Sequence, residues 1–144
     1  MISVHIRGMN AAIDEIRTRT AYESLASSLP YKCVCAHCAN FRAIGSSAFP
    51  KDVLEFFSRA GIDPMQPAET YELGAFGEGK HLYGGEYYFF GDAPLSDRPT
   101  LDPSGKFDFA FTAPSPLAQA EFSKPDAVCF SFLVALPWVI SEPP

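Results

Sequence analysis

Basic residues are scarce in this sequence. Its 144 residues include 11 Lys and Arg against 17 Asp and Glu, which gives a formal net charge of −6. The imbalance lies in residues 61–144, where 4 basic residues face 12 acidic ones. Binding to a phosphate backbone requires Lys and Arg to displace counterions, so we predict no nucleic-acid partner. A basic protein partner suits a field of this sign, although acidic loops also serve simply to keep a domain in solution.

Long hydrophobic runs and targeting signals are lacking too. The longest apolar run, residues 128–140, is interrupted by Ser131 and Pro137 and is too short to cross a bilayer. Residues 1–8 have no basic start, no continuous apolar stretch and no small-residue cleavage site. We therefore expect no membrane association and a cytoplasmic location.

Common catalytic signatures are missing as well. The sequence contains no HExxH, GxSxG or GxGxxG motif, the patterns of zinc hydrolases, serine hydrolases and dinucleotide-binding enzymes. Residues 74–80 match the GxxxxGK spacing of a phosphate loop, but His81 stands where Ser or Thr should meet magnesium. The residues that follow read as a strand and not as a helix. We interpret this segment as a glycine-rich hairpin turn, and we identify no catalytic residue.

Aromatic residues, in contrast, are abundant. The chain is 47% hydrophobic and 14% aromatic and contains 13 Phe, a composition typical of a globular domain. We predict one domain that spans residues 1–144. A chain of this length buries roughly two-thirds of its unfolded surface, so we expect a core that requires no cofactor.

The fold class follows from a change in hydrophobic period. Over about 50–60, Pro50 suits a first helical turn and Gly61 a left-handed stop. The apolar stripe between them consists of Val53, Phe56, Phe57 and Ala60. From residue 69 the period changes to two, which predicts strands at about 69–76, 81–90, 106–112 and 126–136; residues 2–6 alternate in the same way. The sequence therefore predicts an α+β fold, an antiparallel sheet of five or six strands with one main helix, about 50–60, packed on it.

Two further predictions concern the structure of residues 11–29 and the face of the last strand that contacts the helix. Residues 11–29 allow a strand, because Ile16, Thr18, Thr20 and Tyr22 alternate, or a short helix capped by Asn10; we favour the strand. In the last strand the larger residues alternate with smaller ones such as Cys129 and Ser131. We expect the small-residue face to receive the helix.

The densest group of ligand-type side chains is Cys33, Cys35 and Cys38. Cys35 and Cys38 have the C-x-x-C spacing that directs two thiolates at one zinc ion. The fourth ligand is unknown, the candidates being His5, His37, His81 and Cys129. The alternative is that these cysteines are buried and behave as small hydrophobes. A thioredoxin-type redox motif is disfavoured, because it requires a strand before the motif and a helix after it.

Several short motifs together suggest a relationship. They are Cys35-x-x-Cys38-x-Asn40-Phe41, Phe49-Pro50, Gly61-Ile62-Asp63-Pro64 and Pro137-Trp138-Val139. In this order they resemble a family of small, acidic, uncharacterised bacterial proteins over most of residues 33–139. The resemblance implies no catalytic residue. More loosely, a small acidic domain of this kind is similar to bacterial toxin-immunity proteins.

We therefore weigh three functional hypotheses. The first is a non-catalytic protein-binding domain of the immunity type, whose acidic loops between residues 61 and 126 meet a basic partner; its partner-binding residues are unknown. The second is a zinc- or thiol-dependent protein that uses Cys33, Cys35 and Cys38. The third is an enzyme with a Cys-His pair assembled by the fold.

Overall fold

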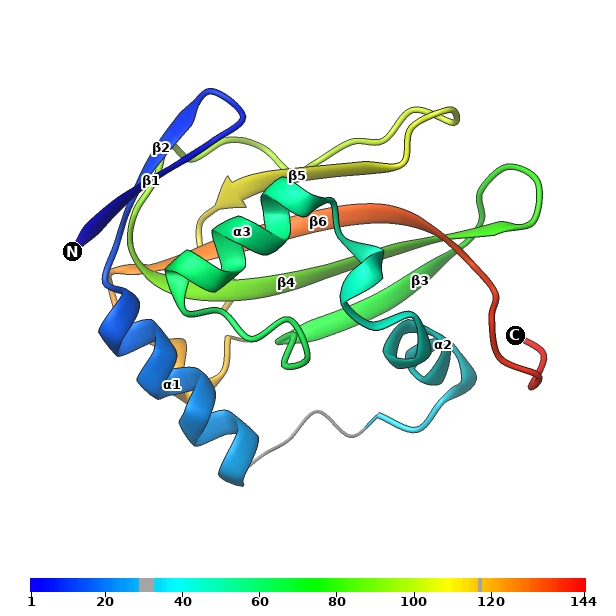
Figure 1. Ribbon diagram of the computed structural model, residues 1–144, viewed down its shortest axis with the longest axis horizontal. Coiled ribbons are helices and arrows are strands. Elements are labelled where there is room, and N and C mark those ends of the chain that lie inside the picture. The colour runs from blue at the N-terminus through cyan, green and yellow to red at the C-terminus, as the bar shows by residue number, and fades with distance from the viewer. Residues whose placement is uncertain (29–32, 117) are drawn as a thin grey trace.

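The protein has an α+β fold in which three helices pack on a six-stranded antiparallel sheet (Figure 1). The computed structural model describes residues 1–28, 33–116 and 118–144. The strands are β1 (Ile2–Ile6), β2 (Met9–Ile13), β3 (Glu69–Ala75), β4 (Lys80–Asp92), β5 (Phe107–Thr112) and β6 (Ala127–Pro137). The helices are α1 (Glu15–Ser28), α2 (Ala36–Ile44) and α3 (Lys51–Ala60), with short 3₁₀ turns η1 (Gly45–Ala48) and η2 (Ala120–Phe122). The predicted fold class and strand number are confirmed.

Strand β4 organises the sheet. One of its edges pairs with β6 from Lys80, opposite Pro137, to Phe90, opposite Ala127. Strand β5 then pairs with the far edge of β6. The other edge of β4 is shared, because β3 pairs with residues 81–86 and β2 with residues 91–92. The predicted hairpin turn at residues 74–80 joins β3 to β4.

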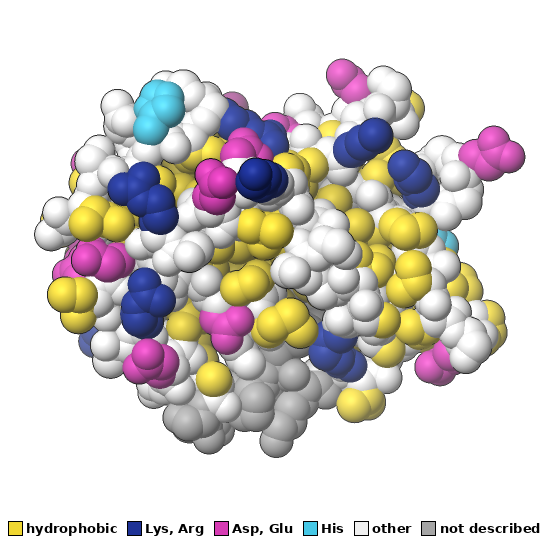
Figure 2. All heavy atoms as spheres, in the orientation of Figure 1, with side chains coloured by type: hydrophobic (Ala, Val, Ile, Leu, Met, Phe, Trp, Pro, Cys, Tyr) yellow, Lys and Arg dark blue, Asp and Glu magenta, His cyan; other side chains and the backbone are white. Residues whose placement is uncertain are grey.

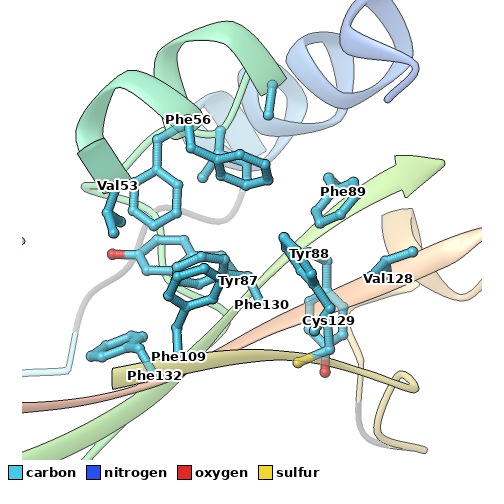
Figure 3. Close-up of a cluster of buried hydrophobic side chains, with 14 of the residues drawn as sticks. Val53, Phe56, Tyr87, Tyr88, Phe89, Phe109, Val128, Cys129, Phe130 and Phe132 are labelled. Atoms are coloured by element: carbon cyan, nitrogen blue, oxygen red, sulfur yellow. The ribbon is translucent and has the colours of Figure 1, made fainter. Parts of the chain in front are cut away.

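Helix α3 packs on this sheet through aromatic side chains, as the sequence predicts. Its apolar stripe is buried, and Gly61 ends the helix with φ = 85° in the left-handed region that favours glycine. The Phe130 ring packs against both the helix and the sheet: its centroid lies 5.0 Å from that of Phe57 on α3 and 4.6 Å from that of Phe109 on β5. Figure 3 shows Phe130 and Phe109 in this cluster. The core therefore consists largely of interlocked rings between α3 and the sheet.

The helix-facing side of β6 differs from our prediction. Phe130 and Phe132 face the helix layer, where Phe132 lies 5.2 Å from Phe49. The smaller Cys129 and Ser131 point to the opposite side of the sheet and line a polar hollow there. The prediction was wrong because α3 presents its own large rings, which pack better against other rings than against small side chains.

The strand that we favoured for residues 11–29 is also wrong. Only Met9–Ile13 is a strand, and residues 15–28 form α1; residue 29 lies outside the described residues. The Tyr22 hydroxyl donates to the Tyr88 carbonyl oxygen at 2.8 Å and accepts from the Tyr88 amide at 3.1 Å. The Phe90 amide donates to Thr18 Oγ1 at 3.1 Å. Helix α1 thus satisfies the edge of β4 that neither β2 nor β3 covers.

The number of helices also exceeds the prediction of one main helix. Helix α2 begins within the cysteine group and packs beside β3, while α1 and α3 contact each other. No helix within the described ranges is both long enough and apolar enough to span a bilayer.

Candidate metal centre

Three cysteine sulfurs converge at the start of α2. The Sγ atoms of Cys33, Cys35 and Cys38 all lie within 4.8 Å of one another. Cys33 and Cys35 are exposed, whereas Cys38 is buried. The structure therefore contains a group of three close thiols that could hold a metal ion, formed by the residues that the sequence singles out.

The C-x-x-C spacing brings two of these sulfurs together through helix capping. Cys35 is the N-cap of α2, and its Sγ accepts a hydrogen bond from the Cys38 backbone amide at 3.4 Å. The side chain of an N-cap residue reaches the backbone amide three positions later, in the first turn of the helix. Ser and Asp cap helices in the same way. Cys33 completes the group from outside the helix, with its Sγ 3.4 Å from that of Cys35.

The local field favours the ionised form of Cys33. A hydrogen bond from the Cys35 backbone amide lowers the pKa of the Cys33 thiol, and hydrogen bonds with the other two cysteines and the charge of Arg42 act in the same direction. The N-terminus of a helix carries a partial positive charge, which also stabilises a thiolate. Because thiolates are the form that binds metals, the site is suited to a cation.

Buried hydrogen bonds hold α2 in place under the sulfurs. Asn40 is fully buried; its amide nitrogen donates to the Pro137 carbonyl oxygen at 3.1 Å, and its oxygen accepts from the Val139 amide at 2.7 Å. The Tyr83 hydroxyl donates to the His37 carbonyl oxygen at 3.0 Å. Cys38 Sγ lies 3.8 Å from Thr70 Oγ1 on β3. The sequence motif includes Asn40, but the sequence does not indicate that the Asn40 side chain links α2 to the segment at the end of β6 by hydrogen bonds.

The four candidates for a fourth ligand lie elsewhere. His37 Nε2 and His81 Nδ1 both contact the Glu72 carboxylate, at 3.4 and 3.3 Å. Both rings also pack against Trp138. His5 contacts Asn10 on the exposed β1–β2 hairpin. In the parts of the chain that the structure describes, no fourth Cys, His, Asp or Glu atom joins the three sulfurs.

Cys129 is a different kind of thiol. It lies on β6, is buried, and pairs with Tyr88 across the strands. Burial raises the pKa of Cys129 to about 11, which disfavours the thiolate that a metal requires. The buried-hydrophobe interpretation therefore describes Cys129 well, but not the exposed Cys33 and Cys35.

Comparison of the chain with protein-family models, with curated proteins and with solved structures gives no match. The resemblance to small bacterial proteins, the immunity-type function and the basic partner therefore stay predictions. The geometry of the described residues carries the functional argument.

Proposed function

We propose that this protein binds one zinc ion through the thiolates of Cys33, Cys35 and Cys38. The convergence of the three sulfurs within 4.8 Å carries the proposal. In a tetrahedral site with Zn–S bonds of about 2.3 Å, the sulfurs lie roughly 3.8 Å apart. The Cys33–Cys35 separation is 3.4 Å, and all three sulfurs lie within 4.8 Å of one another, so movements of about 1 Å would bring them to the spacing of a zinc site.

The zinc in this proposal keeps one position for a ligand from outside the described site. Structural zinc sites are closed by four protein ligands, whereas sites that act on other molecules have three plus water. Here two of the three cysteines are exposed residues, so the fourth position would be accessible to water or to a donor atom of another molecule. The site therefore supports binding of an external ligand by zinc.

The position of the site argues against a purely structural metal. The ring cluster of α3, β4, β5 and β6 forms the core, and Cys33 and Cys35 lie outside it on the surface. Removal of zinc should therefore loosen the start of α2 and leave the sheet and α3 folded. Zinc-dependent folding of the whole chain would be typical of domains that lack such a core.

Metal analysis tests the proposal. The full chain, purified without chelator and under reducing conditions, should contain about one zinc ion per molecule. Single Cys→Ser variants at positions 33, 35 and 38 should lose most of this zinc. The matched control, Cys129→Ser, removes the fourth thiol of the chain and should retain it. A zinc content near zero with all thiols reduced, or equal zinc in all four variants, would contradict the proposal.

A further inference from the structure

A second site lies on the helix side of the sheet and includes none of the cysteines. It is a groove of about 500 Å³ between η1 and the start of α3 on one side and the start of β5 and the end of β6 on the other. Its walls are mainly apolar, with Ile44, Phe49, Phe107 and Leu136 among them. This size falls within the range of small-molecule sites, roughly 300–1,000 Å³.

Two lysines flank the groove. Lys80 begins β4 opposite Pro137, and Lys106 precedes β5, its carbonyl oxygen accepting from the Ala135 amide at 3.0 Å. Both line the groove, which has no acidic residue in its wall. Figure 2 shows two basic side chains beside hydrophobic ones over this end of the sheet.

Neither lysine has a counter-ion among residues 1–28, 33–116 and 118–144. Among the described residues, Arg7 pairs with Asp52 and Arg17 with Asp126, but neither Lys80 nor Lys106 forms an ion pair. They are two of the four basic residues in the acidic segment 61–144. Two unpaired cations beside an apolar groove are complementary to an anionic group on an apolar ligand.

The few polar atoms of the groove limit the chemical class of ligand that it can bind. The Ser47 hydroxyl already donates to the Ile44 carbonyl oxygen at 2.7 Å. Apart from the two lysines, Ser47 has the one polar side chain among the described residues that line the groove, so few side chains there could pair with the amide groups of a buried peptide, and burial of unpaired amides is costly. A hydrocarbon chain has no such groups. We propose that this groove binds a free fatty carboxylate of medium chain length, with the chain on the apolar wall and the carboxylate between Lys80 and Lys106.

Titration with matched small molecules tests this site. Octanoate has both the chain and the charge, octan-1-ol has the chain alone, and acetate has the charge alone. Octanoate should bind at least about tenfold more tightly than octan-1-ol, a difference of about 1.4 kcal/mol, because its carboxylate forms charge-assisted hydrogen bonds with the lysines. Acetate should not bind measurably. Amide chemical-shift changes should centre on residues 44–49, 106–107 and 134–136.

Substitutions distinguish the contribution of the two lysines to binding from that of the apolar wall. The double variant Lys80→Gln/Lys106→Gln should lose the preference for octanoate and keep its affinity for octan-1-ol. Lys124→Gln changes a lysine of the same acidic segment that does not line the groove, and it should behave as the unmodified protein. Equal binding of octanoate and octan-1-ol, or unchanged octanoate affinity in the double variant, would overturn the proposal. So would binding of anionic lipid vesicles without binding of octanoate.

Discussion

The Sγ atom of Cys35 accepts a hydrogen bond from the backbone amide of Cys38, at a distance of 3.4 Å. One side chain thus has two tasks: it caps α2 and supplies a sulfur to the three-thiol group. Substitutions at this position can separate the two, because serine caps helices well but is a poor zinc ligand.

Cys35→Ser should lose zinc and keep the stability of the apoprotein, whereas Cys35→Ala should lose both. Removal of an N-cap side chain costs about 0.5–2 kcal/mol. Urea denaturation in the presence of a chelator measures how much the N-cap contributes to the stability of the apoprotein. Metal analysis measures whether the side chain at position 35 binds zinc. Equal zinc in the serine variant and the unmodified protein would contradict the assigned role of the Cys35 sulfur.

Cys33 should be the most reactive thiol of the apoprotein near neutral pH. Its pKa is lowered by the Cys35 backbone amide, so it is ionised at pH values where an ordinary thiol is still protonated. Its thiolate is lost as the pH falls through this lowered pKa, and zinc affinity should fall with it. Alkylation at several pH values, followed by peptide mapping, measures the order in which the thiols react. Faster modification of Cys129 than of Cys33 would contradict this electrostatic account.

Cys129 should make the folded state sensitive to alkali. Its pKa rises to about 11 in the folded protein, so between its unfolded and folded pKa values the folded state binds more protons than the unfolded one. Stability therefore decreases as the pH rises through this window, by roughly 1.4 kcal/mol for each unit by which the two pKa values differ.

The control for this prediction is Cys129→Ala, which has no thiol to ionise. The free energy of unfolding, measured in urea between pH 8 and 11 (a window that spans roughly the ordinary and the raised thiol pKa), should decrease less steeply in the variant than in the unmodified chain. Parallel curves would show that Cys129 is not buried as described.

Asn40→Ala should destabilise the attachment of α2. It removes the acceptor of the Val139 amide and the donor to the Pro137 carbonyl oxygen, two partly buried hydrogen bonds, and each such bond contributes about 0.5–1.5 kcal/mol. Asn10→Ala is the matched control, because Asn10 is exposed and its side chain bonds to the exposed His5. Urea denaturation should show a loss at position 40 and a change below about 0.5 kcal/mol at position 10. Equal effects at the two positions would contradict the role of Asn40.

The sequence is informative where the determining interactions are local. Helix α3 is predictable because its first turn, apolar stripe and Gly61 stop are close in the chain and agree. Helix α1 is not, because two of its buried positions, Thr18 and Tyr22, carry hydroxyls that bond to the backbone of β4. Their burial depends on which part of the β4 edge the other strands leave open.

The candidate metal site likewise has one part that the sequence predicts and another that depends on distant residues. The three cysteines lie within six residues, so their spacing alone predicts that they can meet. Glu72 lies far from His37 in sequence. The pairing of β3 with β4 places the Glu72 carboxylate beside His81, and the packing of α2 on β3 brings His37 to the same carboxylate. Sequence spacing therefore indicates the thiols, but not that these two histidines are already engaged with another residue.

X-ray absorption at the zinc edge of the zinc-loaded, full-length protein tests the central claim most directly. The account predicts a shell of three sulfur atoms at about 2.3 Å and one lighter atom, oxygen or nitrogen, at about 2.0 Å. A zinc environment made of oxygen and nitrogen alone would contradict it, as would failure of the reduced protein to retain zinc.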